Sequence, residues 1–353
     1  MQIDFHHAVT YVTARCAGFS SQEADIIAYA AQYVDDSTSS GPVWFDNKAM
    51  YLRCSSAHGT LDLRNLKNEE NHLVWLPFHF LPGNGGLPAG QDPTGSFIKK
   101  IVCHPNSPVA EDMLEAAISD QGKPFALHRL GITMHVYADT WSHQGFAGVL
   151  HEVNEVDKLM ETSDSGVFKG GLKKFVSGFL DDAVPPLGHG RALIFPDMPF
   201  LSWKYTNGRN ELIERNNTEL FGSAADRMCR AMQRYRRHRD PAVQETGLSP
   251  SDKSVARELF LSFVDKDGYV RHKKWVKAIA DGAFSFGSAS ISYAADGRSS
   301  WKAAALGTSQ DMPVYSYSPD FLRCDWKFFH DALQQHRLTV SHDILPRYGI
   351  CAA

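Results

Sequence analysis

The chain has 353 residues, of which 43% are hydrophobic and 22% are charged, with a formal net charge of −4 at pH 7. This composition is that of a globular protein with a substantial core, and the length suggests about two domains. A pI near 6.5 gives the chain no polycationic character, which argues against non-specific nucleic-acid binding. The six cysteines are scattered without a Cys-x-x-Cys pair, which argues against a cysteine zinc site or a dense disulfide framework.

The N-terminal sequence lacks the basic and apolar regions of a secretory signal peptide, and no stretch approaches about 18 uninterrupted apolar residues. We therefore expect no transmembrane segment. The expected location is the cytoplasm, or the outside of the cell after export by a route that uses no cleaved signal peptide.

The hydrophobic pattern predicts an all-α fold: a multi-helix bundle with long Pro/Gly loops and a mostly helical C-terminal extension. Ser20 or Ser21 is expected to be the N-cap of the second helix. A boundary near 240–250 separates a first domain, 1–245, from a C-terminal region, 246–353, which either stands apart or packs on the first as one unit. Helices are expected at 7–16, 22–34, 108–119, 124–143, 148–161, 169–181, 209–238, 251–264, 271–281 and 318–337, with loops at 81–95 and 183–202 and loop or short strands at 283–317.

The segment from 135 to 143, His-Val-Tyr-Ala-Asp-Thr-Trp-Ser-His, places three potential metal ligands on one helical face. His135, Asp139 and His143 are four residues apart, and four residues return to nearly the same face of an α-helix. At a rise of about 1.5 Å per residue the two histidines lie roughly 12 Å apart along the axis. Because zinc lies only about 2 Å from each ligand atom, the spacing favours two or more ions bridged by the central Asp139. A chance surface pairing among the 16 histidines is the competing interpretation.

Histidines and aspartates in four other segments are further ligand candidates. His6, in Asp-Phe-His-His, is a better candidate than His7, because Val9 and Val12 then lie on nearby positions that face the core. Asp35 and Asp36 end an apolar helix, where a buried carboxylate pair would need partners, although an exposed helix end explains them equally well.

The other two segments lie in or beside loops. His79 stands between aromatic residues and prolines, where a core histidine bonded to the backbone is the alternative. His189 lies in a glycine-flanked turn and Asp197 follows eight residues later, an arrangement that a purely structural turn also explains.

The order of these segments resembles the zinc-dependent phospholipase C and fungal single-strand nuclease superfamily, which comprises all-helical enzymes with a three-zinc cluster. The motifs Gln-Tyr-Val-Asp-Asp, His-Val-Tyr-Ala-Asp-Thr-Trp-Ser-His-Gln-Gly-Phe and Gly-His-Gly…Pro-Asp are similar to those of a bacterial and fungal branch of phosphatidylcholine-preferring phospholipases C without ordinary signal peptides. The resemblance covers roughly residues 1–240. It implies a site of two or three zinc ions with ligands at His6, Asp35 or Asp36, His79, His135, Asp139, His143, His189 and Asp197.

The better-known members of the superfamily also bind zinc through the free amine of a mature N-terminal tryptophan. Here residue 1 is a methionine, five residues before His6, so an amine ligand is not expected. The spacing of His189 and Asp197 also departs from the family pattern, because the pair is separated by eight residues rather than four.

The resemblance implies a zinc-dependent phosphodiesterase that cleaves phospholipid headgroups during transient contact with a membrane surface. Metal ions would polarise the phosphoryl oxygens and lower the pKa of a bound water, and Asp35 or Asp36 would be the general base. His128, one heptad before His135, is a candidate supporting residue. The alternatives are a single-strand nuclease or nucleotidase on the same metal platform, the one case in which nucleic acid is a partner, and a non-catalytic metal- or lipid-binding module.

Overall fold

A computed structural model of the chain describes residues 1–58, 68–163 and 187–351. The protein is about 53% helical and 10% strand. The all-α prediction is therefore wrong, because two small antiparallel sheets accompany the helices and make the fold a mixed one.

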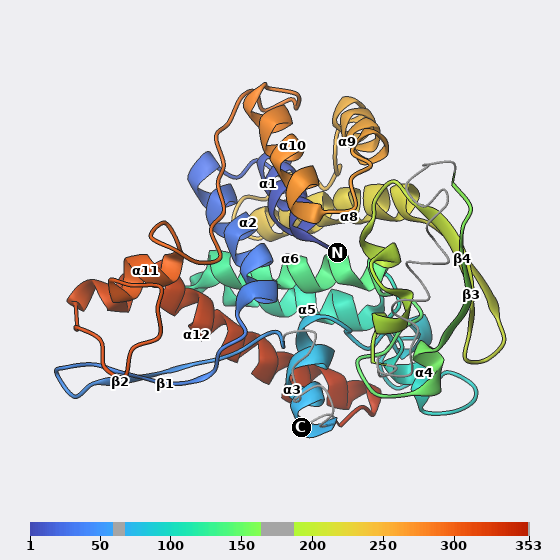
Figure 1. Cartoon of the computed structure of the whole chain (residues 1–353), viewed down its shortest axis with the longest axis horizontal. Helices are drawn as coiled ribbons and strands as arrows, with labels where there is room; N and C mark the ends of the chain where they lie inside the picture. Colours follow the sequence, from blue (N-terminus) through green and yellow to red (C-terminus); the bar gives the residue numbers. More distant parts are fainter. Residues whose placement is uncertain (59–67, 164–186, 352–353) are drawn as a thin grey trace.

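The helices form the body of the molecule, and the sheets lie at its sides (Figure 1). The α-helices described are α1 (Thr10–Cys16), α2 (Ser21–Asp36), α3 (Asn68–Phe78), α4 (Ile98–Ile101), α5 (Pro108–Ser119), α6 (Ala126–Ser142), α8 (Asn217–Arg237), α9 (Pro250–Ser262), α10 (Gly268–Ala280), α11 (Trp301–Leu306) and α12 (Asp325–Leu338). Among them, α11 lies in the segment 283–317 for which loop or short strands were expected. A short π-helix, η1 (Asp4–Val9), precedes α1.

Helix α6 runs through the centre of the molecule and packs against α2, α5, α8 and α12 (Figure 1). Nearly every residue of α6 is buried, polar ones included. A helix enclosed on all sides holds its side chains in fixed positions, so its polar residues must find partners within the protein.

Helix α2 begins at a capping box and ends at the carboxylates of Asp35 and Asp36. The Ser20 side chain accepts a hydrogen bond from the Glu23 backbone N–H, and the Glu23 side chain accepts one from Ser20, which identifies Ser20 as the N-cap. The helix then runs sixteen residues to Asp36 and packs along α6.

Two predicted helices are partly strand. Within 148–161 the chain forms β3 (Val156–Glu161), and 209–238 begins with β5 (Leu212–Asn216) before α8 starts at Asn217. With β4 (Ser202–Asn207) these strands make a three-stranded sheet of order β3-β4-β5. Strand β4 alternates buried and half-buried residues, the period of two that a strand requires, and the Asn207-Gly208 dipeptide at its end favours a hairpin turn.

The second sheet is a hairpin of β1 (Gly41–Trp44) and β2 (Met50–Arg53), which extends from the body of the molecule (Figure 1). The helix expected at 169–181 lies outside the described residues.

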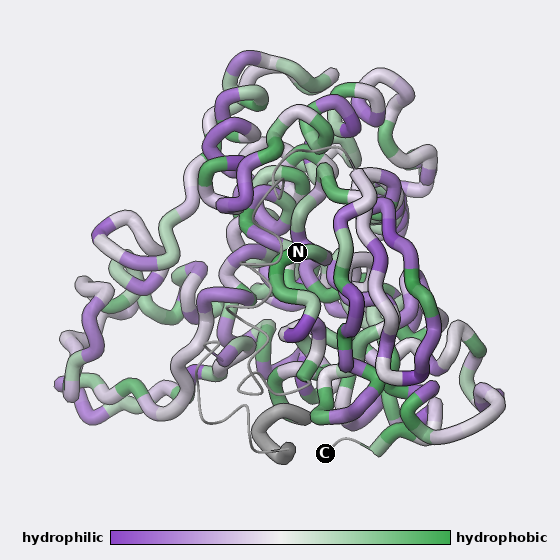
Figure 2. Tube along the Cα trace, turned by 45° about the vertical axis from the view of Figure 1, so that its right-hand side comes forward, coloured by the Kyte–Doolittle hydropathy of each residue, from purple (hydrophilic) through white to green (hydrophobic). Residues whose placement is uncertain are grey.

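The largest hydrophobic core includes residues from both sides of the predicted boundary at 245/246, with Phe5 stacked on Phe260 at a centroid distance of 6.1 Å. Hydrophobic stretches surround the N-terminus and run through the middle of the molecule (Figure 2). The division into two domains stays a prediction. Among the described residues, none of the helices combines the length and hydrophobicity needed to cross a bilayer.

Candidate metal centre

Helix α6 presents His135, Asp139 and His143 from consecutive turns, as the four-residue spacing predicted. The Asp139 Oδ2 atom lies 3.3 Å from His135 Nε2 and 3.6 Å from His143 Nδ1, and all three side chains are buried. His143 is the C-cap of the helix, so the row of ligands ends where the helix ends. Asp139 therefore lies between the two imidazoles.

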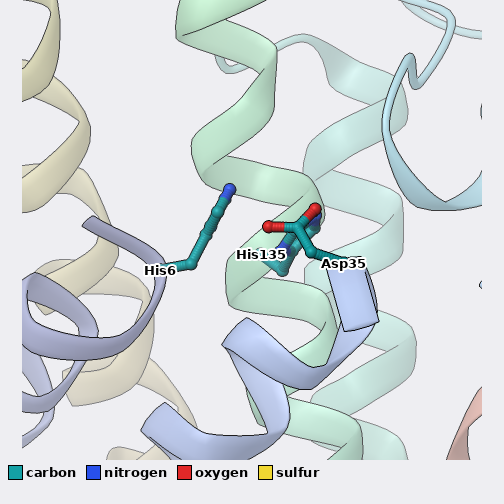
Figure 3. Close-up of side chains that lie close together, drawn as sticks. All are labelled: His6, Asp35 and His135. Carbon is teal, nitrogen blue, oxygen red and sulfur yellow. The ribbon is translucent and has the colours of Figure 1, made fainter. Parts of the chain in front are cut away.

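Three other segments bring ligand atoms to the same place. His6 comes from η1, Asp35 from the end of α2, and His79 follows α3. Figure 3 shows His6, Asp35 and His135 converging from η1, α2 and α6. His6 Nε2 lies 3.2 Å from Asp139 Oδ1, and His79 Nδ1 lies 3.6 Å from Asp139 Oδ2 and 3.8 Å from Asp35 Oδ1.

His189 and Asp197 come from two short 3-10 turns and face each other, with 3.8 Å between His189 Nε2 and Asp197 Oδ2. The imidazoles of His189 and His143 have centroids 4.7 Å apart, which joins this pair to the end of α6. Gly188 has φ +53°, and a Cβ there would lie 2.2 Å from the Phe80 ring, so only glycine fits before His189.

Four of the five imidazoles are oriented by a hydrogen bond to a backbone carbonyl. His135 Nδ1 lies 2.8 Å from the Ala31 oxygen, and His143 Nδ1 lies 2.7 Å from the His79 oxygen. His79 Nε2 bonds to the Ser56 oxygen, and His189 Nδ1 to the Leu193 oxygen, both at 2.9 Å. Such a bond fixes the tautomer and leaves the other ring nitrogen with its lone pair free to bind a metal.

Burial and charge set the protonation states that a metal site needs. Burial lowers the pKa of His135 to about 4 and that of His143 to about 3, although the neighbouring Asp139 acts in the opposite direction. Burial alone would raise the pKa of Asp139, but its electrostatic interactions with His143, the Met1 amine and His6 hold it well below its ordinary value. Neutral imidazoles facing an ionised carboxylate are the forms that bind cations.

Asp35 has the opposite electrostatic setting. One third of its side chain is exposed. Even so, the pKa of Asp35 is raised well above its usual value, mainly because the carboxylate is poorly solvated and secondly because Asp139 is negatively charged. Two carboxylates this close repel each other unless a positive charge lies between them.

The ligand atoms form three groups, each with atoms within 4.8 Å of one another. The groups are His6, Asp35 and His135; His79, His135 and Asp139; and His143, His189 and Asp197. Both ring nitrogens of the fully buried His6 lack a hydrogen-bond partner among the described residues, a costly arrangement that a bound cation would relieve. The residues therefore fit a polynuclear metal site made of nitrogen and oxygen donors.

The Met1 amine, which was not expected to be a metal ligand, lies inside this cluster as an ion-pair partner of two aspartates. Its nitrogen is 2.7 Å from Asp139 Oδ1 and 3.2 Å from Asp197 Oδ1. Burial alone would lower the pKa of this amine, but Asp139 and Asp197 raise it to about 11. The amine thus links the ligand group that contains Asp139 to the ligand group that contains Asp197.

Asp36, the other predicted carboxylate, belongs to none of the three groups. Its Oδ2 accepts hydrogen bonds from the Tyr293 hydroxyl at 2.5 Å and from Gln32 Nε2 at 3.0 Å. Gln32 Nε2 also lies 3.4 Å from Asp35 Oδ2, so the amide spans the two carboxylates.

Most of the cluster, all but His6 and His135, lines a cavity of about 620 Å³. Trp75, Phe80 and Leu187 supply apolar wall, and the segment 266–269 before and at the start of α10 supplies part of the rim. A metal ion held by these residues would be accessible through a cavity of this size to a small molecule or to one end of a larger one.

Sequence reasoning missed several residues of this site: the Met1 amine, Gln32, Tyr293, the segment 266–269 and His58, which also lines the cavity. Gln32 stands one helical turn before the two aspartates, which is a usable signal. The candidate His128 lies two turns before His135, where its Nε2 bonds to Asp325 at 3.0 Å, away from the three groups.

Neither the curated proteins nor the solved structures include a significant match to this chain. A family model described as "Family of unknown function (DUF6765)" matches residues 1–344. Since that match spans nearly the whole sequence and includes every residue of the candidate metal centre, the chain belongs to the DUF6765 family.

Proposed function

We propose that this protein is a metal-dependent phosphodiesterase and, more specifically, a phospholipase C that cleaves headgroups of the phosphatidylcholine type. The observation that carries the proposal is the convergence of five histidines and three aspartates, from six separate segments, into three adjoining ligand groups below a cavity. Polynuclear sites of this kind are used for hydrolysis at phosphorus.

The donor set suits two or three zinc ions, because neutral imidazoles and carboxylates are ordinary zinc ligands. Asp139 would be shared between ions, since each of its oxygens lies near a different histidine. When bound, the ions supply Lewis-acid polarisation of the phosphoryl oxygens and a water with a pKa lowered to about 7.

The carboxylates at the cavity floor orient the attacking water. Asp35 is the better placed of the two general-base candidates, because it stands in a ligand group with His6 and His135 and its partly exposed carboxylate also lines the cavity. Asp36 Oδ2 is already an acceptor for Tyr293 and Gln32, so Asp36 supports the base rather than replacing it.

The cavity wall accommodates the lipid part of the substrate. Trp75, Phe80 and Leu187 offer an apolar surface to the glycerol and the first acyl carbons. Outside the three ligand groups, Asp36 and Asp267 line the same cavity together with Lys266, so a cationic headgroup finds carboxylate partners there.

Metal analysis of the purified protein tests the site. We expect two or three zinc ions per chain, a loss of metal in His135→Ala and Asp139→Ala, and retention in the matched control His128→Ala, which is on the same helix but outside the ligand groups. If the wild type holds no more than one transition-metal ion and both variants keep it in full, the site assignment fails.

The substrate is tested by comparing two reactions, each with and without a chelator. Chelator-sensitive release of phosphocholine from dispersed short-chain phosphatidylcholine supports the phospholipase. Cleavage of single-stranded DNA instead would assign a nuclease to the same centre, and tight zinc binding without either activity would identify a non-catalytic module.

A further inference from the structure

The hairpin of β1 and β2 has one face that is apolar and exposed. Successive strand residues point to opposite faces, and the register pairs Trp44 with Met50 and Pro42 with Leu52. These four residues are exposed, with Trp44, Met50 and Leu52 about half accessible to solvent. Exposed large hydrophobic side chains gathered on one sheet face mark an interaction surface rather than chance.

The opposite face of the hairpin accounts for its position. Val43 and Phe45 are buried, and Phe45 packs against Phe321 at a centroid distance of 4.9 Å. The Tyr51 hydroxyl donates to Asp331 Oδ1 at 2.9 Å. The hairpin is thus held to the C-terminal region by one face, which leaves the other face pointing outward.

A neighbouring segment of the C-terminal region enlarges the exposed face. Tyr315 pairs with Phe45, and its backbone N–H donates to the Trp44 carbonyl at 2.8 Å. Met312 and Val314, just before Tyr315, are also about half exposed. We call the set Pro42, Trp44, Met50, Leu52, Met312 and Val314 the apolar face.

The size and charge of the apolar face decide what binds to it. A stable interface with a second protein takes roughly 20–30 residues from each side, many more than these six. None of the six is charged, the hairpin turn carries one acidic and one basic residue, Asp46 and Lys48, and the neighbouring basic side chains of Arg53 and Lys302 are both paired with Asp311, at 2.9 and 2.8 Å. The apolar face therefore matches a broad surface that has no net charge and an apolar layer below its polar outer layer.

We propose that the apolar face docks on the interfacial region of a zwitterionic lipid bilayer, a proposal that rests on the proposed function for the choice of lipid. Tryptophan favours this region because its ring is apolar and its N–H polar, and leucine, methionine and valine gain free energy when they leave water. Docking by the hairpin would keep the protein at the surface from which its substrate is drawn.

Sedimentation with phosphatidylcholine vesicles tests the face directly. We expect wild-type protein to bind the vesicles equally at 0.1 and 0.5 M NaCl, since burial of apolar surface is not screened by salt. Trp44→Ser/Leu52→Ser should weaken binding at least tenfold. The matched control Leu212→Ser removes a leucine that is even more exposed, on the other sheet, and should change nothing.

A second measurement does not depend on a disruptive variant. Brominated phosphatidylcholine should quench part of the wild-type tryptophan fluorescence, and Trp44→Phe, which keeps the face apolar, should bind as before but lose that quenching. Unchanged quenching in Trp44→Phe would overturn the proposal. Binding that requires anionic vesicles, or a wild-type dimer that the double variant dissociates, would overturn it as well.

Hydrolysis of a dissolved short-chain substrate separates this proposal from the proposed function. If the chain hydrolyses that substrate but ignores vesicles, the docking surface is wrong and the enzyme assignment stands. If vesicle binding follows the apolar face while no phosphodiester is cleaved, the docking surface stands and the enzyme assignment fails.

Discussion

Arg271 Nε donates a hydrogen bond to Asp4 Oδ2 at 2.6 Å, and both side chains are buried. The pair joins α10 to η1, two residues before His6. Arg271 Nη2 also donates to Gln2 Oε1 at 2.9 Å and to the Asp197 carbonyl at 3.3 Å. One guanidinium from the last third of the chain thus holds two segments that carry metal-ligand candidates.

Removing this guanidinium should be costly, because it leaves a buried carboxylate without its cation. We expect Arg271→Met to destabilise the protein by about 3–5 kcal/mol and to lower its metal content. Lys277→Met is the matched control: it breaks a pair with Asp281 of 2.7 Å on the same helix, but an exposed one worth less than about 0.5 kcal/mol. Urea unfolding and metal analysis measure both effects. Equal losses of stability and metal in the two variants would contradict the role of Arg271 in holding the ligand segments.

The two buried aspartates of the centre should differ in how much metal they retain. Asp139 lies within 3.6 Å of nitrogens of four histidines, whereas Asp197 Oδ2 lies 3.8 Å from the nitrogen of His189. We expect Asp139→Asn to abolish most metal binding and Asp197→Asn to cost about one ion per chain. Isosteric asparagines keep the side-chain volume, so titration of the apo-protein with zinc reports on the charge. Equal stoichiometry in the two variants would exclude a shared Asp139.

The helical part of the site was predictable because the period of the α-helix is a local property. The spacing of His135, Asp139 and His143 placed them on one face whatever surrounded that face, and the N-cap of α2 was narrowed to Ser20 or Ser21, of which the structure shows Ser20. Local sequence was less informative for β5, where charged residues precede a long helix and resemble its first turn. The Asn207-Gly208 turn was the signal that the helix prediction overlooked.

Contacts between distant segments explain what sequence could not provide. The Met1 amine lies at Asp139 and Asp197, and Arg271 binds the adjoining Gln2 and Asp4, but no spacing rule connects residues 1, 139 and 271. Similarly, our choice of Asp35 over Asp36 as the proposed general base depends on the hydrogen bond from Tyr293 to Asp36, and Tyr293 lies in the C-terminal region.

Acid should destabilise the fold through buried histidines far from the metal centre. Burial lowers the pKa of His330 to about 3, with Nδ1 3.0 Å from the Cys54 oxygen. The unfolded state takes up a proton near pH 6.5 and the folded state only near pH 3, so the stability is complete above pH 6.5 and is lost as the pH falls between these values.

The slope for this one group is about 1.4 kcal/mol per pH unit. The His330→Asn variant cannot take up that proton. Between pH 6.5 and pH 5 its free energy of unfolding should therefore fall by about 2 kcal/mol less than that of the wild type. Urea unfolding of both proteins at the two pH values gives the difference. Parallel losses would show that the histidine is charged in the folded protein.

The closeness of α2 and α6 links the stability of the fold to the geometry of the centre. A Cβ at Gly131 would lie 2.4 Å from the Ile27 carbonyl oxygen and 2.7 Å from the Ala30 Cβ. Gly131→Ala should therefore separate the helices at a cost of about 1–3 kcal/mol. It should also weaken zinc binding, because the separation moves Asp35 away from His135 and stretches the bond from His135 Nδ1 to the Ala31 oxygen.

Gly222 is the matched control for this substitution. It lies inside α8, and a Cβ there would meet none of the described residues within 4 Å. Gly222→Ala should therefore stabilise the protein by up to about 1 kcal/mol through helix propensity and leave the zinc affinity unchanged. Urea unfolding and zinc titration of the two alanine variants make the comparison. If Gly131→Ala lowers stability but leaves zinc affinity intact, the ligands on α6 and α2 do not depend on the spacing of their helices.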